Sequence, residues 1–128
     1  MPPNIRTITL VKKDYNLRIN QKFTVFGWGM NEKAVISNVL YKGQAEVVPK
    51  NTCAAPGTST QFCAAGATVC FGDGGGPAVL ASGADNEVQI GIISIKQYTK
   101  ADKCEGPSFY TDLTAVVDWV NEIAQLKQ

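Results

Sequence analysis

A run of three glycines is the feature that most constrains how this 128-residue chain can fold. The run lies in the stretch from Cys70 to Pro77, which reads Cys-Phe-Gly-Asp-Gly-Gly-Gly-Pro. Glycine loses more backbone entropy on folding than any other residue, so we expect the fold to need this backbone for a tight turn or a close approach. Successive amide N–H groups in such a turn can also form an anion-binding site. The alternative interpretation is an ordinary glycine-rich turn.

Length and composition predict one globular, loop-rich domain with its own core. The chain is 45% hydrophobic and 18% charged, with 12 Gly and 6 Pro. The net charge of +1 predicts no general attraction to nucleic acid or to a membrane surface. Residues 1–50 hold eight Lys/Arg against three Asp/Glu, whereas residues 51–128 hold four against eight. We interpret this asymmetry as solvated surface and not as a basic binding face.

The cysteines predict disulfides and secretion. No two are spaced Cys-x-x-Cys and the chain has no histidine, so a metal site is not expected. Disulfides are typical of secreted proteins. Four cysteines allow three pairings, and their spacing alone does not choose among them. The four are Cys53, Cys63, Cys70 and Cys104.

The N-terminus has no apolar core of the kind found in signal peptides, and no run is long enough to span a membrane. Met1-Pro2-Pro3 is therefore interpreted as the start of a mature or recombinant segment. We expect neither a nucleic-acid partner nor a membrane partner.

Short segments rich in β-forming residues, separated by turn residues, predict an all-β domain. The segment 49–60 is expected to be a loop, and 82–86 a hairpin turn. A helix is expected from Thr114, as its N-terminal cap, to Gln128. Its apolar stripe would be formed by Val116, Trp119, Val120 and Ile123. The predicted strands are 5–10 (or an extended linker), 23–29, 38–48, 61–66, 77–81, 88–94 and 107–111.

The glycine stretch resembles the Gly-Asp-Ser-Gly-Gly-Pro signature of the trypsin/chymotrypsin-like serine proteases, with Gly74 in place of the serine. Gly-Trp-Gly at 27–29, Cys-Ala-Ala-Gly at 63–66 and Tyr-Thr followed by Trp-Val near the C-terminus resemble further motifs of this family. The resemblance begins near residue 3 and covers only the C-terminal half of such a protease.

The resemblance implies a single six-stranded antiparallel Greek-key barrel with a C-terminal α-helix. Residues 1–22 would correspond to the linker that crosses between barrels, and residues 23–128 to the barrel and its helix. The implied disulfides are Cys53–Cys63 and Cys70–Cys104. Many relatives have a further disulfide whose positions match Phe23 and Leu80, so we expect a packed apolar contact there instead.

The resemblance also implies that this chain is not an enzyme. Serine-protease chemistry needs an activated hydroxyl, an imidazole and an orienting carboxylate. Gly74 has no hydroxyl, and the imidazole and orienting carboxylate belong to the N-terminal barrel of the family. The oxyanion-hole amides would be those of Gly72 and Gly74. Asp73 matches the aspartate that pairs with a newly cut N-terminus in activated relatives, so we expect a zymogen-like loop.

The former specificity pocket differs from that of trypsin. The position at the bottom of this pocket is occupied by Thr68 and not by a carboxylate. A trypsin-like preference for Arg or Lys side chains in the substrate would therefore be lost. Ser94 matches the family, but Ile95 and Lys96 replace the usual Trp-Gly where the substrate backbone would lie. Ser108 stands where many relatives have glycine. Together these changes predict that the former substrate-binding cleft no longer recognises substrates.

Several other residues are not expected to take part in catalysis or ligand binding. Asp112, Asp118 and Glu122 are expected on the solvated surface and not as an acid/base pair. Trp28 and Trp119 are expected in the core or in an interface. The glycine run lacks the following helix and lysine of a nucleotide-binding loop.

We therefore expect a secreted, non-catalytic serine protease homologue that binds or regulates another protein, without a cofactor. A cofactor role in a defence proteolytic cascade is the narrower hypothesis. The partner, or a second copy in a homodimer, would cover the face that the other barrel covers in a complete protease, unless substitution has made that face polar. Two alternatives remain: a decoy or inhibitor that binds a protease or a protease inhibitor, and a fragment or engineered half of a two-barrel protease.

Overall fold

The computed structural model describes residues 4–5, 7–28, 38–53, 59–66, 73–81, 87–96 and 107–124. Several sequence predictions lie outside these residues. They concern Thr68, Gly72, the Cys70–Cys104 disulfide, the turn at 82–86 and the helix beyond residue 124.

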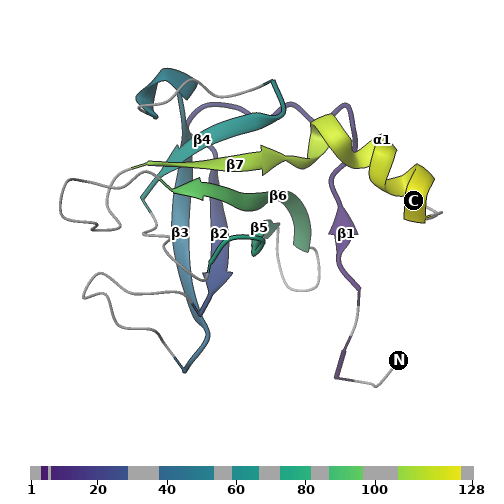
Figure 1. Ribbon diagram of the computed structural model, residues 1–128, viewed down its shortest axis with the longest axis horizontal. Coiled ribbons are helices and arrows are strands. Elements are labelled where there is room, and N and C mark those ends of the chain that lie inside the picture. The colour runs from purple at the N-terminus through teal and green to yellow at the C-terminus, as the bar shows by residue number, and fades with distance from the viewer. Residues whose placement is uncertain are drawn as a thin grey trace.

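The described residues form seven strands and one α-helix (Figure 1). Most predicted strands are present with shifted ends, and the predicted loop at 49–60 contains a short 3₁₀ turn, η1 (Lys50–Thr52). The strands are β1 (Thr9–Leu10), β2 (Lys22–Gly27), β3 (Tyr41–Val48), β4 (Gln61–Ala65), β5 (Pro77–Ala81), β6 (Glu87–Lys96) and β7 (Ser108–Asp112), and the helix is α1 (Leu113–Ala124).

Strands β2 to β7 form a closed antiparallel barrel, which confirms the predicted fold. Neighbouring strands follow the order β6-β5-β2-β3-β4-β7, and β7 pairs back to β6. Strands β2, β3 and β4 are consecutive, and β5 returns to lie beside β2, which is a Greek-key connection. Strand β1 is added to the barrel by parallel pairing with β6.

Three aromatic rings fill the barrel interior. The Phe62 and Tyr110 rings are stacked with centroids 5.3 Å apart, and Phe23 meets both edge-on at 5.7 and 5.2 Å. Such pairs add to the stabilisation that apolar burial provides. Gly91 makes this packing possible, because a Cβ there would lie 3.0 Å from the Phe62 ring and 2.9 Å from the Thr111 carbonyl oxygen.

The Cys53–Cys63 disulfide is present, with Cα atoms 6.2 Å apart. Both cysteines are buried in a second cluster with Phe109, on the other face of β7 from Tyr110. The disulfide therefore attaches the loop after β3 to strand β4.

The N-terminal segment supplies part of the core. Val11 is only 4% exposed and belongs to the main cluster, and Leu10, Tyr15 and Leu17 pack against it. The boundary drawn between residues 22 and 23 remains a prediction.

The two positions that replace a family disulfide face each other. Thr24 pairs with Val79 and Val25 with Ala78, so one step further Phe23 lies opposite Leu80. Phe23 is buried in the main cluster and Leu80 packs against that cluster.

Two details of the predicted helix are wrong. The cap is Asp112, whose Oδ1 accepts bonds from the Thr114 backbone N–H at 2.9 Å and from its hydroxyl at 2.7 Å. Asp112 is therefore not merely solvated surface. The buried stripe begins at Leu113 and includes Val117, whereas Trp119 is 64% exposed. Trp119 follows Leu113 by six residues, which places it about 120° round the helix from the buried face.

Candidate functional site

Residues 73–76 form a β-turn, named here the reactive-site turn because the sequence resemblance implies that Gly74 occupies the position of the family's serine. The Gly76 N–H donates to the Asp73 carbonyl oxygen at 3.0 Å. Gly75, third in the turn, has a φ of +85°, as a type II turn requires. The run from Asp73 to Gly76 is therefore a hydrogen-bonded turn, as its glycines predict.

The three glycines are not equally required. Gly75 supplies the positive φ. At Gly76 a Cβ would lie 2.9 Å from the Asp73 carbonyl oxygen and 3.0 Å from that of Phe26. Gly74 is different: it is exposed, its φ is not positive, and a Cβ there would meet no atom within 4 Å. The expectation that the backbone needs all three glycines is therefore wrong for Gly74.

The turn is attached to β6 by two backbone hydrogen bonds. The Gly75 N–H donates to the Ile93 carbonyl oxygen at 2.8 Å, and the Ile93 N–H donates to Gly76 at 2.9 Å. The N–H groups of Gly75 and Gly76 thus point at backbone carbonyls and not at an anion. The amides of Gly75 and Gly76 are therefore not available to bind an anion.

The same attachment brings two predicted site residues, Gly74 and Ser94, into one region. Ser94 follows Ile93 and is exposed, so it lies beside the turn that contains Gly74. Lys96 pairs with Ser108 across β6 and β7. The backbones of Ile95 and Lys96 are in β6, and their side chains lie outside the described residues, as do Thr68 and Gly72.

Ser108 is a buried polar residue in this region. It is 1% exposed, and its Oγ has no hydrogen-bond partner among the described residues. Side chains alternate along a strand, so Ser108 shares the inner face of β7 with Tyr110.

Asp73 points into the protein. Its residue exposure is 8%, and a Cβ on Gly27 would lie 1.9 Å from its Oδ1. Burial raises the pKa of Tyr110 well above its ordinary value, and the negative charge of Asp73 raises it further. The Asp73 carboxylate therefore lies against Gly27 of β2. The zymogen-like conformation of the loop that contains Asp73 stays a prediction.

Sequence reasoning missed the contact between Gly27 and Asp73. The Gly-Trp-Gly motif marks this glycine, but only the tertiary structure places the carboxylate on it. The described residues contain no group of three or more His, Cys, Asp or Glu that could hold a metal ion. No helix among them is long and apolar enough to cross a bilayer.

A closed, six-stranded antiparallel Greek-key barrel with a C-terminal helix is the architecture of a trypsin-like serine protease barrel. Residues 1–120 match the Trypsin family. The chain belongs to that family.

Three curated relatives illustrate the match. Melanization protease 1 of Drosophila melanogaster is 30% identical over 125 residues, which cover 88% of this chain and 31% of the relative. Phenoloxidase-activating factor 1 of Holotrichia diomphalia is 32% identical over 128 residues, covering 91% and 34%. A trypsin of Phaedon cochleariae is 32% identical over 120 residues, covering 84% and 43%. The chain thus spans less than half of the length of each.

Proposed function

We propose that this chain is a non-catalytic, secreted member of the trypsin family that binds and regulates a protein partner. The observation that carries the proposal is Gly74. It lies exposed on a turn with room for a side chain, yet it presents no hydroxyl where the family presents its nucleophile. Histidine is absent from the chain, so it supplies no imidazole base either. The Cys53–Cys63 disulfide supports an oxidising, extracellular compartment.

The loss of activity can be tested with a fluorophosphonate probe, which labels activated serine nucleophiles. We expect no labelling of the wild-type chain and none of Gly74→Ser, because a restored hydroxyl still has no base in this chain. Trypsin is the positive control. Specific labelling of the wild-type protein would contradict the proposal.

The partner-binding surface is assigned to the edge formed by α1 and the N-terminal segment, which lie on the same side of the barrel (Figure 1). Trp119 and Ile123 are each 64% exposed and lie one turn apart on α1. Large exposed apolar side chains that lie together are typical of interaction sites. This edge is the candidate for the face that the other barrel covers in a complete protease.

A pair of tryptophan variants tests this surface. We expect Trp119→Glu to abolish capture of the partner from native extracellular fluid, or to dissociate a homodimer measured by light scattering. Trp28→Glu is the matched control, since Trp28 is 55% exposed but follows β2 and not α1. Equal loss in both variants, or a strict monomer that captures nothing, would contradict the assignment.

The names of two relatives support the narrower role in a defence cascade. One is a melanization protease and another a phenoloxidase-activating factor. We therefore expect the captured partner to be a protease or a substrate of such a cascade. Capture of a protease inhibitor instead would favour a decoy.

A further inference from the structure

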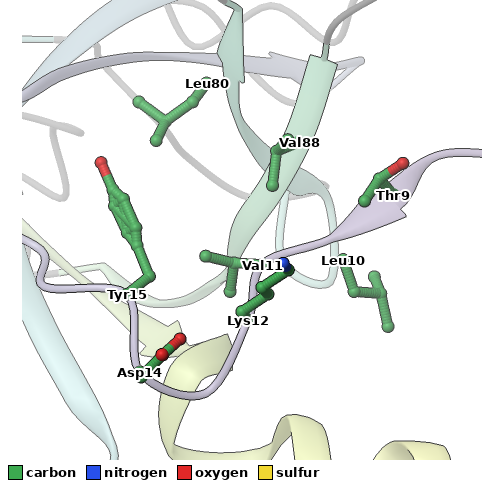
Figure 2. Close-up of a pocket in the computed structure, with 8 residues that line it drawn as sticks. All are labelled: Thr9, Leu10, Val11, Lys12, Asp14, Tyr15, Leu80 and Val88. Carbon is green, nitrogen blue, oxygen red and sulfur yellow. The ribbon is translucent and has the colours of Figure 1, made fainter. Parts of the chain in front are cut away.

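An apolar cavity lies where the N-terminal segment passes over β5 and β6 (Figure 2). Its volume is about 380 Å³, within the range typical of small-molecule pockets. The aliphatic part of its wall consists of Leu10 and Val11 from the N-terminal segment, Leu80 from β5 and Val88 from β6. No residue of the reactive-site turn contributes to it.

The cavity wall is held in place before any ligand binds. Val11 is 4% exposed, and its N–H donates to the Gln89 carbonyl oxygen at 3.0 Å. The Tyr15 N–H donates to the Lys12 carbonyl oxygen at 3.1 Å, and the Tyr15 hydroxyl accepts a bond from Gln21 Nε2. A wall that is already ordered loses little entropy on binding, which favours affinity.

Covering the aliphatic wall with a ligand would contribute favourable free energy of binding. Leu10, Leu80 and Val88 are only partly buried although they pack against the main core cluster. Apolar area removed from water contributes to binding roughly in proportion to its size. An apolar chain of a ligand would complete the burial of these three side chains.

The rim of the cavity carries one basic and one acidic side chain. Lys12 and Asp14 both line the opening and are exposed. In Figure 2 the Lys12 nitrogen is drawn beside Val11, whereas the Asp14 carboxylate lies at the edge near α1. The neighbouring Lys13 pairs with Asp118 at 3.2 Å, and no ion pair joins Lys12 to another described residue.

From this combination we infer that the cavity binds a medium-chain carboxylate amphiphile, such as a fatty acid. The hydrocarbon chain lies against Leu80 and Val88, and the carboxylate lies at the rim beside the Lys12 ammonium. The inference goes beyond the proposed function, because this site needs neither a protein partner nor the reactive-site turn.

Binding is tested by titrating the ¹⁵N-labelled protein with decanoate, below the concentration at which it forms micelles, and in parallel with the uncharged analogue 1-decanol. We expect saturable shifts of the Val11, Leu80 and Val88 amides. We expect decanoate to bind about tenfold more tightly than decanol, because only decanoate can pair with Lys12. Shifts confined to other surfaces, or no saturable shift, would overturn the inference.

Charge-reversal variants separate the head group from the chain. Lys12→Glu is expected to weaken decanoate about tenfold or more and to leave decanol unchanged. Lys42→Glu on β3 is the matched control, since it makes the same charge change at an exposed residue outside the cavity. Equal weakening by both substitutions would show a general charge effect and would sink the assignment to Lys12.

Val88→Phe fills the cavity and is expected to abolish binding of both ligands. If this variant does not fold, the Lys12→Glu comparison with decanol still decides the question. The Trp119→Glu variant is expected to bind decanoate normally, so failure here and failure of the proposed function are distinguishable. If the sole effect of decanoate is to dissociate a homodimer, the cavity is occupied by a second copy of the chain and the inference is wrong.

Discussion

The Asp73 carboxylate lies in the space that a side chain on Gly27 would need. A Cβ on Gly27 would be 1.9 Å from Asp73 Oδ1, far closer than van der Waals contact. The pair joins two segments that are far apart in the sequence, the end of β2 at Gly27 and the turn at 73–76.

Gly27→Ala is expected to destabilise the protein by about 1–3 kcal/mol, because overpacking forces neighbouring atoms to move. The free energy of unfolding is measured by urea denaturation. In an Asp73→Ala background the same substitution should cost clearly less, since the clashing group is gone. Equal costs in both backgrounds would show that the carboxylate is not the obstacle.

The glycines of the turn are expected to differ in their tolerance of alanine. Gly75→Ala should destabilise by about 1–2 kcal/mol, because its φ of +85° disfavours a Cβ. Gly74→Ala is the matched control and should be neutral or stabilise by up to about 1 kcal/mol, because it restricts the unfolded chain without a clash. Thermal unfolding followed by circular dichroism distinguishes them, and equal losses would refute the type II turn.

Loss of the helix cap is expected to be measurable. Asp112→Ala removes the acceptor of both Thr114 hydrogen bonds and should cost about 1 kcal/mol of unfolding free energy. Glu122→Ala is the control, since Glu122 is an exposed acidic residue within the same helix. A cost for Asp112→Ala no larger than that of the control would contradict the cap.

Because the pKa of Tyr110 is raised in the folded protein, we expect the free energy of unfolding to fall at alkaline pH. This pKa is raised first by burial and then by Asp73, whereas the unfolded chain loses the phenol proton near the ordinary pKa of about 10. The unfolded state then binds fewer protons than the folded state, so stability falls as pH rises. This contribution is fully present below about pH 10 and is lost as pH rises from there toward the raised pKa.

Tyr110→Phe keeps the stacked ring and removes the titrating group. We expect the melting temperature of the variant to fall less than that of the wild type between about pH 9 and 11.5, where the slope from one tyrosine reaches up to about 1.4 kcal/mol per pH unit. Tyr41→Phe is the control, since Tyr41 is 60% exposed. Parallel curves for the wild type and Tyr110→Phe would exclude Tyr110 as the source.

The sequence alone determined the fold class and most of the strands. Through the family resemblance it also implied the Cys53–Cys63 disulfide, which is present. β-forming residues alternate with turn residues along the chain, and the Gly-Trp-Gly and glycine-run motifs resemble one family. The identity of Gly74 and the absence of histidine are facts of the sequence, so the proposal that this chain is non-catalytic rests on the sequence.

Only the tertiary structure decided which neighbours these residues meet. Gly74 and Gly76 are identical in sequence, but one faces open space and the other faces two carbonyl oxygens. Asp112, expected on the surface, caps α1, and Trp119, expected in the core or in an interface, is 64% exposed. The cavity beside Lys12 is made from strands far apart in the chain. Such relationships depend on distances between remote segments, which local residue patterns do not encode.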